Sequence, residues 1–324
     1  MSLPPLGLDL AKLKFNACLV RDGGKLRHKV FTNDPDGFAR LAGWLSQQGV
    51  ARVHACMEAT GTYGDSLASY LHEAGHAVSR VNPAAIKAYA QSHLSRTKTD
   101  RVDAALIAGF CAERRPPAWA PPAPELRELQ ALVRRLDSLV EMRTMEQNRL
   151  SSGIAVAAVR ESVEELIAHL SEQIRRTEAL IRAHIDSHAG LRRQRELLDS
   201  IPGVGEATAA VLLAEVPDIK EYRSARQVAA FAGLVPREWQ SGSSVRGRVR
   251  LSKIGNARLR KALYFPAVTA LRCSHFFQRW AEGLRQRGKS KMAVIGAAMR
   301  KLIHLAYGVL KTGRPFDPEW AQRA

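Results

Sequence analysis

Five of the nine residues from position 116 to 124 are proline, and this stretch constrains the fold more than any other part of the sequence. Proline has no backbone N–H and a fixed φ, so neither a helix nor a central strand can run through it. Strand-like and helix-like patterns alternate before the stretch. The 76 residues from 125 to 200 contain no proline and only two glycines. We therefore interpret residues 116–124 as a linker between regions of different architecture.

Residues 1–115 have the pattern of an α/β domain. The apolar run from Leu6 to Val20 predicts a strand, and residues 25–32 predict a second one. Asp22, Gly23 and Gly24 between them indicate a hairpin turn, because glycine accepts positive φ. We expect further strands at 52–59 and 76–81, and helices at 36–48, 64–74 and 100–113. A hairpin followed by alternating strands and helices predicts an α/β layer with a mixed sheet.

Residues 125–196 have a helical pattern. Leucines recur at a spacing of three to four residues from Leu129 to Leu139, and Val, Leu and Ile do so from Val163 to Ile181. This pattern predicts a helical hairpin or a coiled coil, interrupted near 151–153, whose expected role is self-association. A helical bundle within one subunit explains the pattern nearly as well. Residues 197–324 form a last region, which we expect to be mainly α-helical.

The excess positive charge is concentrated in the last third of the chain. The formal net charge is +18, and residues 220–324 hold 22 Lys and Arg against 5 Asp and Glu. This asymmetry favours a polyanionic partner, and nucleic acid above all.

Other sequence features exclude several classes of protein. No uninterrupted apolar run reaches the ~18 residues of a membrane span, and the first ten residues lack the pattern of a signal peptide. The four cysteines are far apart and form no CxxC pair, so neither zinc binding nor a disulfide framework is expected. We expect a protein of a reducing cytoplasm with no membrane partner.

Four acids form a pattern suited to a metal ion. Asp9 interrupts an apolar strand, and Glu58 stands at the C-terminal end of a later strand. Asp100 and Asp103 are spaced i, i+3, which places both carboxylates on one face of a helix. Each acid alone has a structural explanation, such as a cap or a surface position. Together, sheet-end acids and a helical pair can hold two Mg²⁺ ions about 4 Å apart, an arrangement that cleaves phosphodiesters.

The basic region contains two elements that suit nucleic acid. In the segment Ile201–Gly205, Gly203 and Gly205 allow a tight turn that directs backbone N–H groups at a phosphate, although an ordinary helix–helix turn is the alternative. A Gly/Ser loop beginning at Ser241 then enters a segment without acids. The nucleic-acid-binding candidates of this segment are Arg246, Arg248, Arg250, Lys253, Asn256, Arg258, Arg260 and Lys261.

These motifs carry a resemblance to a known family. GLDLAK, MEATG and especially KTDRVDA resemble the RuvC/RNase H-like domain of the DEDD transposases, insertion-sequence enzymes described as bridge-RNA-guided recombinases. The resemblance implies an RNase H fold in which Asp9, Glu58, Asp100 and Asp103 bind Mg²⁺. It also implies a dimer or tetramer and a structured noncoding guide RNA.

The motif SG-x-x-x-RG-R-x-x-LSK-x-GN-x-x-LR resembles the second, Tnp domain of the same family. There the serine that opens the motif is a nucleophile, which implies a covalent link between Ser241 and DNA. Ser243 and Ser244 lie close enough to be alternatives, and a hydroxyl that only holds phosphate is a further one. A serine needs activation by a base or metal. No histidine lies in this stretch, so activation would come from the acid–metal centre, and a second subunit could supply Ser241.

The sequence thus predicts a transposase that cleaves and exchanges DNA strands. Two alternatives stay open at this point. A metal-dependent nuclease or junction resolvase would use water in place of the serine, and a nucleic-acid-binding module would have kept the fold without activity.

Overall fold

The chain forms two compact units, Met1–Pro121 and Pro122–Ala324. The computed structural model describes residues 3–59, 63–94, 99–216, 218–238, 240–241, 245–246 and 249–319, and of residues 220, 240, 241, 245 and 246 it describes the backbone alone. The boundary between the two units in the sequence falls between two prolines of the stretch 116–124. The finer division into four regions stays a prediction.

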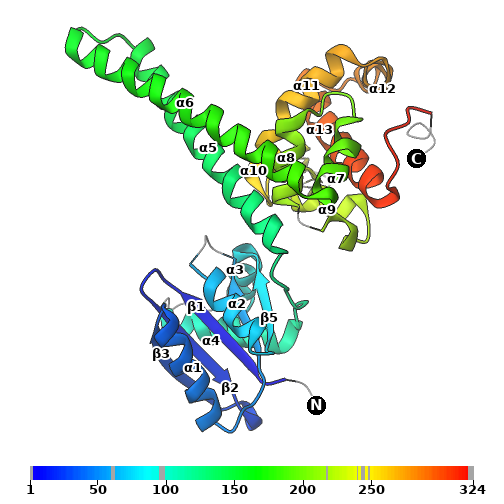
Figure 1. Cartoon of the computed structure of the whole chain (residues 1–324). Coiled ribbons are helices and arrows are strands. Elements are labelled where there is room, and N and C mark those ends of the chain that lie inside the picture. Colours follow the sequence, from blue (N-terminus) through cyan, green and yellow to red (C-terminus); the bar gives the residue numbers. More distant parts are fainter. Residues whose placement is uncertain are drawn as a thin grey trace. The chain divides into compact units, whose positions relative to one another are not determined.

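A mixed five-stranded sheet forms the centre of the first unit (Figure 1). Its strands are β1 (Pro5–Leu10), β2 (Lys14–Val20), β3 (Leu26–Thr32), β4 (His54–Glu58) and β5 (Ala77–Val81), in the order β3-β2-β1-β4-β5. The first three strands form an antiparallel meander, and β4 and β5 run parallel to β1. The predicted mixed sheet and opening hairpin are confirmed, and η1 (Asp22–Gly24) joins β2 to β3.

The prediction of one strand from Leu6 to Val20 is wrong. The chain turns between β1 and β2, where the backbone N–H of Ala11 donates to the carbonyl of Lys14 at 2.9 Å. The buried alternating positions are even-numbered in β1, at Leu6 and Leu8, but odd-numbered in β2, as at Phe15. Side chains of one strand alternate between faces with a period of two, so this change of phase requires a break.

Helices cover both faces of the sheet. The helices α1 (Pro35–Gln47) and α2 (Asp65–Glu73) bury apolar side chains against one face, where Phe15 and Leu8 belong to the same core as Leu41 and Leu67. The helix α4 (Asp100–Arg114) packs on β1, β2 and β4 from the other face and contacts α3 (Pro83–Ser92). These layers agree with an RNase H-like domain.

Residues 116–119 protect one edge of this sheet. The backbone N–H of Trp119 donates to the carbonyl of Val78 on the edge strand β5 at 2.6 Å. The buried hydroxyl of Ser79 bonds to the carbonyls of Pro116 and Pro117 at 3.0 and 2.8 Å. Prolines suit an edge, because they have no N–H that would need a partner.

Gly7 lets α4 lie directly on the sheet. A Cβ atom at this position would lie 2.1 Å from the carbonyl oxygen of Ala104 and 2.4 Å from the backbone nitrogen of Ala108. No side chain fits in that space, so the backbones of β1 and α4 are in contact at this point. The position of α4, and of the acids at its start, therefore depends on glycine at position 7.

The second unit begins with two long helices and is mostly helical. The helices α5 (Pro124–Ser151) and α6 (Ala157–Ser187) lie side by side (Figure 1), and Leu139, Leu170 and Ile174 form a small buried cluster between them. The predicted interruption near 151–153 coincides with the connection between them. A coiled coil that joins subunits stays a prediction.

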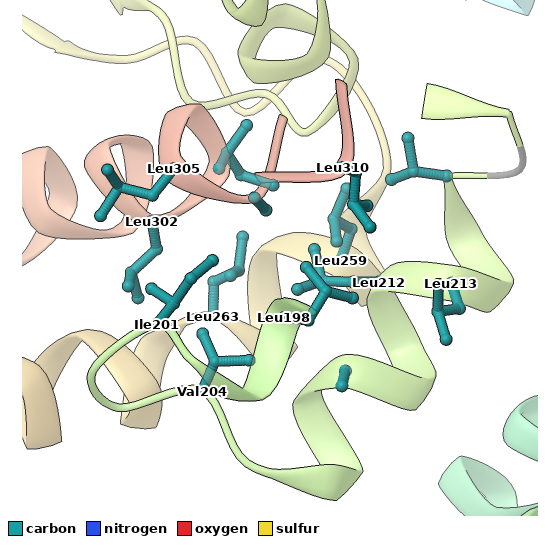
Figure 2. Close-up of a cluster of buried hydrophobic side chains, with 14 of the residues drawn as sticks. Leu198, Ile201, Val204, Leu212, Leu213, Leu259, Leu263, Leu302, Leu305 and Leu310 are labelled. Carbon is teal, nitrogen blue, oxygen red and sulfur yellow. The ribbon is translucent and has the colours of Figure 1, made fainter. Parts of the chain in front are cut away.

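The remaining helices of this unit surround one core. They are α7 (Ala189–Asp199), α8 (Glu206–Glu215), α9 (Ala225–Phe231), α10 (Ala257–Ala262), α11 (Tyr264–Cys273), α12 (His275–Gln286) and α13 (Lys291–Thr312), with a 3-10 turn, η2 (Ile219–Glu221), between α8 and α9. The helix α13 contacts α7, α9, α11 and α12. Figure 2 shows Leu302 of α13 in this core, to which Leu305, Leu198 and Leu263 also belong.

The helix α13 is also long and apolar enough, by length and composition, to cross a membrane. More than half of its apolar window is buried inside the unit. Core helices of other proteins pass the same test, so this one is weak evidence for a membrane.

We predict that Gly7→Ala lowers the free energy of unfolding by about 2–3 kcal/mol, because a methyl group overlaps backbone that only a shift of α4 can clear. The control is Gly43→Ala in α1, where the added Cβ meets nothing within 4 Å. Urea unfolding of both variants measures the difference. Equal stability of the two would contradict the contact at Gly7.

Candidate catalytic and nucleic-acid-binding residues

Asp9 and Glu58 are neighbours at the C-terminal ends of two adjacent strands. The strands β1 and β4 are parallel, and Leu8 lies beside Met57. Asp9 and Glu58 are the pair of positions that follows in this register. Adjacent strands are about 4.8 Å apart. By the alternation of side chains, both acids belong to the face of Gly7 and Cys56, on which α4 packs.

The start of α4 lies at the same end of the sheet. Ala104 packs at Gly7, and further along α4 the thiol of Cys111 donates to the carbonyl of His54 at 3.4 Å. The helix therefore runs opposite to β1 and β4, which brings its N-terminus to their C-terminal ends. Thr99 caps this N-terminus, since its hydroxyl accepts from the backbone N–H of Val102 at 3.3 Å.

Asp100 and Asp103 lie in the first turn of α4, on the side that faces the sheet. Asp100 accepts a hydrogen bond from Asn16 at 3.4 Å and pairs with Lys14 at 3.6 Å. Asn16 is the cross-strand partner of Asp9. The fold thus brings the four predicted acids to one corner of the sheet, although no three His, Cys, Asp or Glu side chains of the described ranges are close enough to hold one ion.

The donor set at this corner is made of oxygen. Two buried thiols of this unit, those of Cys18 and Cys56, are poor ligands at neutral pH because their pKa values are raised. Burial raises the pKa of Cys18 to about 11. A hydrogen bond with Cys111 and burial also raise the pKa of Cys56. Four carboxylates without thiolates suit a hard divalent cation such as Mg²⁺. The first residue of the KTDRVDA motif, Lys98, lies outside the described residues.

Ser241 lies on an antiparallel arm of the second unit. The strands β6 (Pro236–Arg237) and β9 (Arg250–Leu251) pair near its base, and β7 (Gln240–Ser241) and β8 (Val245–Arg246) pair farther out. The partner of Ser241 in this ladder is Val245. The two alternative serines, Ser243 and Ser244, lie outside the described residues, as does Arg248.

The glycine turn of Ile201–Gly205 joins α7 to α8, which fits both a phosphate-binding turn and an ordinary helix–helix turn. Gly203 has φ +87°, and a Cβ there would lie 2.5 Å from the carbonyl oxygen of Pro266 in α11. This glycine is therefore required for packing. Gly205 is exposed, precedes the first turn of α8 and has open space beside its Cα. Of the two, Gly205 is better placed to approach a phosphate.

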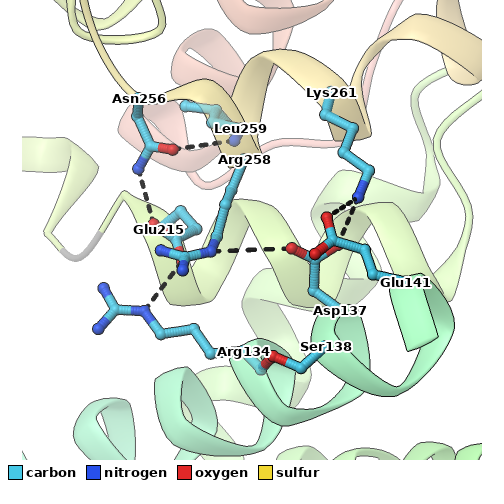
Figure 3. Close-up of polar contacts among 9 residues, drawn as sticks. All are labelled: Arg134, Asp137, Ser138, Glu141, Glu215, Asn256, Arg258, Leu259 and Lys261. Carbon is cyan, nitrogen blue, oxygen red and sulfur yellow. Dashed lines mark hydrogen bonds and ion pairs between the residues drawn. The ribbon is translucent and has the colours of Figure 1, made fainter. Parts of the chain in front are cut away.

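The predicted nucleic-acid-binding residues of the basic segment fall into two groups. The side chains of Arg250 and Lys253 are exposed. Three others make contacts within the unit (Figure 3). Arg258 pairs with Asp137 at 3.8 Å, and Lys261 pairs with both Asp137 and Glu141 at 2.8 Å. Asn256 caps α10. Arg260 donates to two backbone carbonyls. Of Arg246 only the backbone is described.

Sequence reasoning missed the buried carboxylate that organises this group. Glu215, at the end of α8, has a side chain only 3% exposed and pairs with Arg134 of α5 at 3.3 Å. Its other oxygen accepts from the side-chain amide of Asn256 at 2.6 Å. The sequence signal was present, since Glu215 ends the apolar run AAVLLAEV just as Asp9 interrupts an apolar strand. An acid in such a run needs a partner.

Comparison with known proteins agrees with this arrangement. A model of DEDD transposases of the IS110 type matches residues 6–158, and a model described as the transposase IS116/IS110/IS902 family matches residues 195–281. The pilin gene-inverting proteins of Moraxella bovis and Moraxella lacunata are 35% and 34% identical over 98% of this chain and of their own lengths. The transposase for insertion sequence element IS1328 of Yersinia enterocolitica is 26% identical over 96% of this chain and 98% of its own.

The molecule is a DNA transposase or recombinase. It belongs to the IS116/IS110/IS902 family of transposases.

We predict that Glu215→Ala lowers the free energy of unfolding by about 3–5 kcal/mol, because Arg134 and Asn256 lose a buried partner. The matched control is Glu206→Gln, which breaks the exposed pair with Arg182 and should cost less than about 1 kcal/mol. Chemical denaturation of both variants tests this. A loss at Glu215 no larger than at Glu206 would contradict a structural role for the buried carboxylate.

Proposed function

We propose that this transposase exchanges DNA strands through a covalent serine–DNA intermediate, with Ser241 as nucleophile and four acids holding Mg²⁺. One observation carries the proposal. Asp9, Glu58 and the helix start with Asp100 and Asp103 come from distant parts of the sequence and meet at one corner of an RNase H-like sheet.

The four carboxylates fit the metal by their chemistry. All supply oxygen donors, and two of them project from neighbouring strand ends. Bound there, the ions would polarise the phosphodiester and lower the pKa of a coordinated hydroxyl. Lys14 pairs with Asp100 and would have to yield that carboxylate when a cation binds.

The serine divides strand exchange into two transfers. The Oγ atom of Ser241 attacks the phosphorus, an Oγ–P bond forms, and the bond to one deoxyribose oxygen breaks. That oxygen takes up a proton and leaves as a hydroxyl. A hydroxyl of another strand then attacks the same phosphorus and releases the serine. The ester keeps the energy of the phosphodiester, so exchange needs no external energy source.

The partners follow from the same proposal. The substrates are donor and target DNA, and a structured noncoding RNA of the element would select them by base pairing, as in other RNA-guided systems. Gly205, Arg246, Arg248, Arg250 and Lys253 would contact phosphates. The protein would act as a dimer or tetramer in the bacterial cytoplasm, and Ser241 could act on a phosphate held by the acids of another subunit.

The names of two relatives favour recombination over simple cleavage. Proteins that match over nearly their whole length are called pilin gene-inverting proteins. Inversion requires that cut strands be rejoined in a new arrangement. A covalent intermediate serves this purpose, whereas a nuclease that uses water would lose the bond energy.

We predict that Ser241→Ala abolishes the covalent protein–DNA adduct, with a loss of about 10³-fold or more in strand exchange, because it removes the Oγ atom that would form the ester. The assay uses DNA with the joined ends of the element and RNA recovered with the protein, and it detects adducts on denaturing gels. Ser243→Ala and Ser244→Ala are the matched controls. Wild-type cleavage by Ser241→Ala would favour the water-using nuclease, and loss in a control would reassign the nucleophile.

We predict that Asp103→Asn lowers Mg²⁺-dependent cleavage by about 10²-fold or more and weakens binding of Mn²⁺, because it removes one charged ligand. Electron paramagnetic resonance of bound Mn²⁺ gives a readout that is independent of activity. The control is Asp22→Asn, at the exposed turn that follows β2, at the end of β2 that pairs with the start of β1 and not with Asp9. If wild type and Asp103→Asn bind nucleic acid equally and neither cleaves in Mg²⁺, the protein is a binding module.

A further inference from the structure

The arm that carries Ser241 has a stem, formed by residues 231–235 and 252–256, in which the two chains stay paired beyond the strands β6 and β9. Beyond β6 and β9, the backbone N–H of Ser252 donates to the carbonyl of Val235 at 2.9 Å, and that of Lys253 donates to the carbonyl of Gly233 at 3.2 Å. A further bond joins the N–H of Asn256 to the carbonyl of Phe231 at 2.7 Å. The two chains of the stem therefore stay paired down to the end of α9 and the start of α10.

Two glycines allow the chains of the stem to lie this close. A Cβ at Gly255 would lie 2.3 Å from the carbonyl oxygen of Phe231 and 2.7 Å from the backbone nitrogen of Gly233. Gly233 and Gly255 have φ of +69° and +140°. Lys253, on the same chain of the stem as Gly255, has φ +56°. Positive φ at a lysine is uncommon and persists only where surrounding contacts hold it.

The side chain of Arg260 closes the base of the stem. Its Nη1 atom donates to the carbonyl of Ala232 at 3.2 Å and to that of Lys253 at 3.1 Å, so one guanidinium joins the two chains of the stem. A Cβ at Gly233 would lie 2.6 Å from this Nη1 atom. The absence of a side chain at Gly233 therefore makes room for the guanidinium.

The helix that carries Arg260 is itself held in place. Asn256 caps α10 through its side-chain oxygen, which accepts from the N–H of Leu259 at 3.0 Å. The amide of the same Asn256 donates to the buried Glu215 (Figure 3). On the other side of the stem, Arg300 of α13 donates to the carbonyl of Leu234 at 3.4 Å. The stem is thus attached to the core of the unit through both of its chains.

We propose that Arg260 is a positioning residue for strand exchange, which fixes the base of the arm that carries Ser241 and does not serve as a nucleic-acid contact. This inference rests on the serine mechanism proposed above. It corrects the interpretation of Arg260 from sequence, where it was one of seven cations in a basic run. Small displacements of a reacting group are costly, because an error of about 1 Å can lower a rate 10²-fold.

The test separates positioning from phosphate binding. A cation that contacts phosphate contributes about one unit to the slope of log affinity against log salt concentration. We expect Arg260→Ala to keep the wild-type slope, and to form the serine–DNA adduct about 10- to 100-fold more slowly at saturating DNA. The exposed arm residue Arg250 supplies the comparison, since Arg250→Ala should lower the slope by about one.

A second variant reaches the same contact without removing a charge. Gly233→Ala places a methyl group where Nη1 of Arg260 lies, so we expect the same slow adduct formation with an unchanged salt slope. The matched control is Gly288→Ala after α12, which has a similar φ of +72° and where a Cβ meets nothing within 4 Å, so it reproduces the backbone strain without the clash. This second variant keeps the test decisive if Arg260→Ala does not fold.

Hydrogen exchange reports on the stem directly. The amides of Ser252, Lys253 and Asn256 should exchange faster in Arg260→Ala and Gly233→Ala than in wild type, while those of α13 stay protected. Faster exchange confined to the stem, together with a slow rate and a normal salt slope, is the expected result.

Other results would overturn the proposal. A salt slope reduced by one in Arg260→Ala, with a wild-type rate at saturating DNA, would make Arg260 a phosphate contact. Ser241→Ala, assayed in parallel, separates this failure from failure of the serine mechanism. A normal rate in Arg260→Ala beside an inactive Ser241→Ala refutes only the role of Arg260. Adduct formation in Ser241→Ala itself refutes the serine mechanism, and the positioning role with it.

Discussion

The first unit depends on the contact between two backbones at Gly7. The helix α4 lies so close to β1 that even a methyl group at this position would overlap the carbonyl of Ala104. This contact sets where α4 begins, and therefore where Asp100 and Asp103 stand relative to the ends of β1 and β4. Carboxylates gathered in this way repel one another unless a cation lies among them. A rigid contact nearby offsets that tendency to separate.

The second unit uses much of its positive charge internally. Arg258 and Lys261 pair with Asp137 and Glu141 of α5, and the hydrogen bonds that Lys261 donates to these two acids raise its pKa. The net charge of the last third of the chain therefore overstates the charge available to a polyanion. Exposed cations of the described part of the arm, such as Arg250, are better placed to contact phosphates.

Buried polar contacts connect the long helices to the serine arm. Glu215 joins Arg134 of α5 to Asn256 at the start of α10, and α10 carries Arg260 to the base of the arm. A buried carboxylate is stable only when its partners are in place. The position of the arm is therefore linked to the packing of α5 on α8.

Much of the fold could be predicted from sequence because it follows local patterns. The helix spacing of Leu129 to Leu139, the glycines of the hairpin at Gly23 and Gly24, and the prolines of 116–124 act within a few residues. The mixed sheet and the helical second unit agree with these predictions. The prediction of a single strand from Leu6 to Val20 is wrong, because the alternation of buried side chains changes phase between β1 and β2.

The sequence by itself determined the acid pattern, the resemblance and the location of the charge, since these depend on residue types and spacing alone. Only the tertiary structure decided which cations are already paired and which glycines are required for close packing. Arg260 and Arg250 are the same residue type a few positions apart, yet one bridges two carbonyls of the stem and the other faces solvent. The partners of a side chain come from segments distant in sequence, such as Ala232 for Arg260 and Asp137 for Lys261, and no local pattern encodes them.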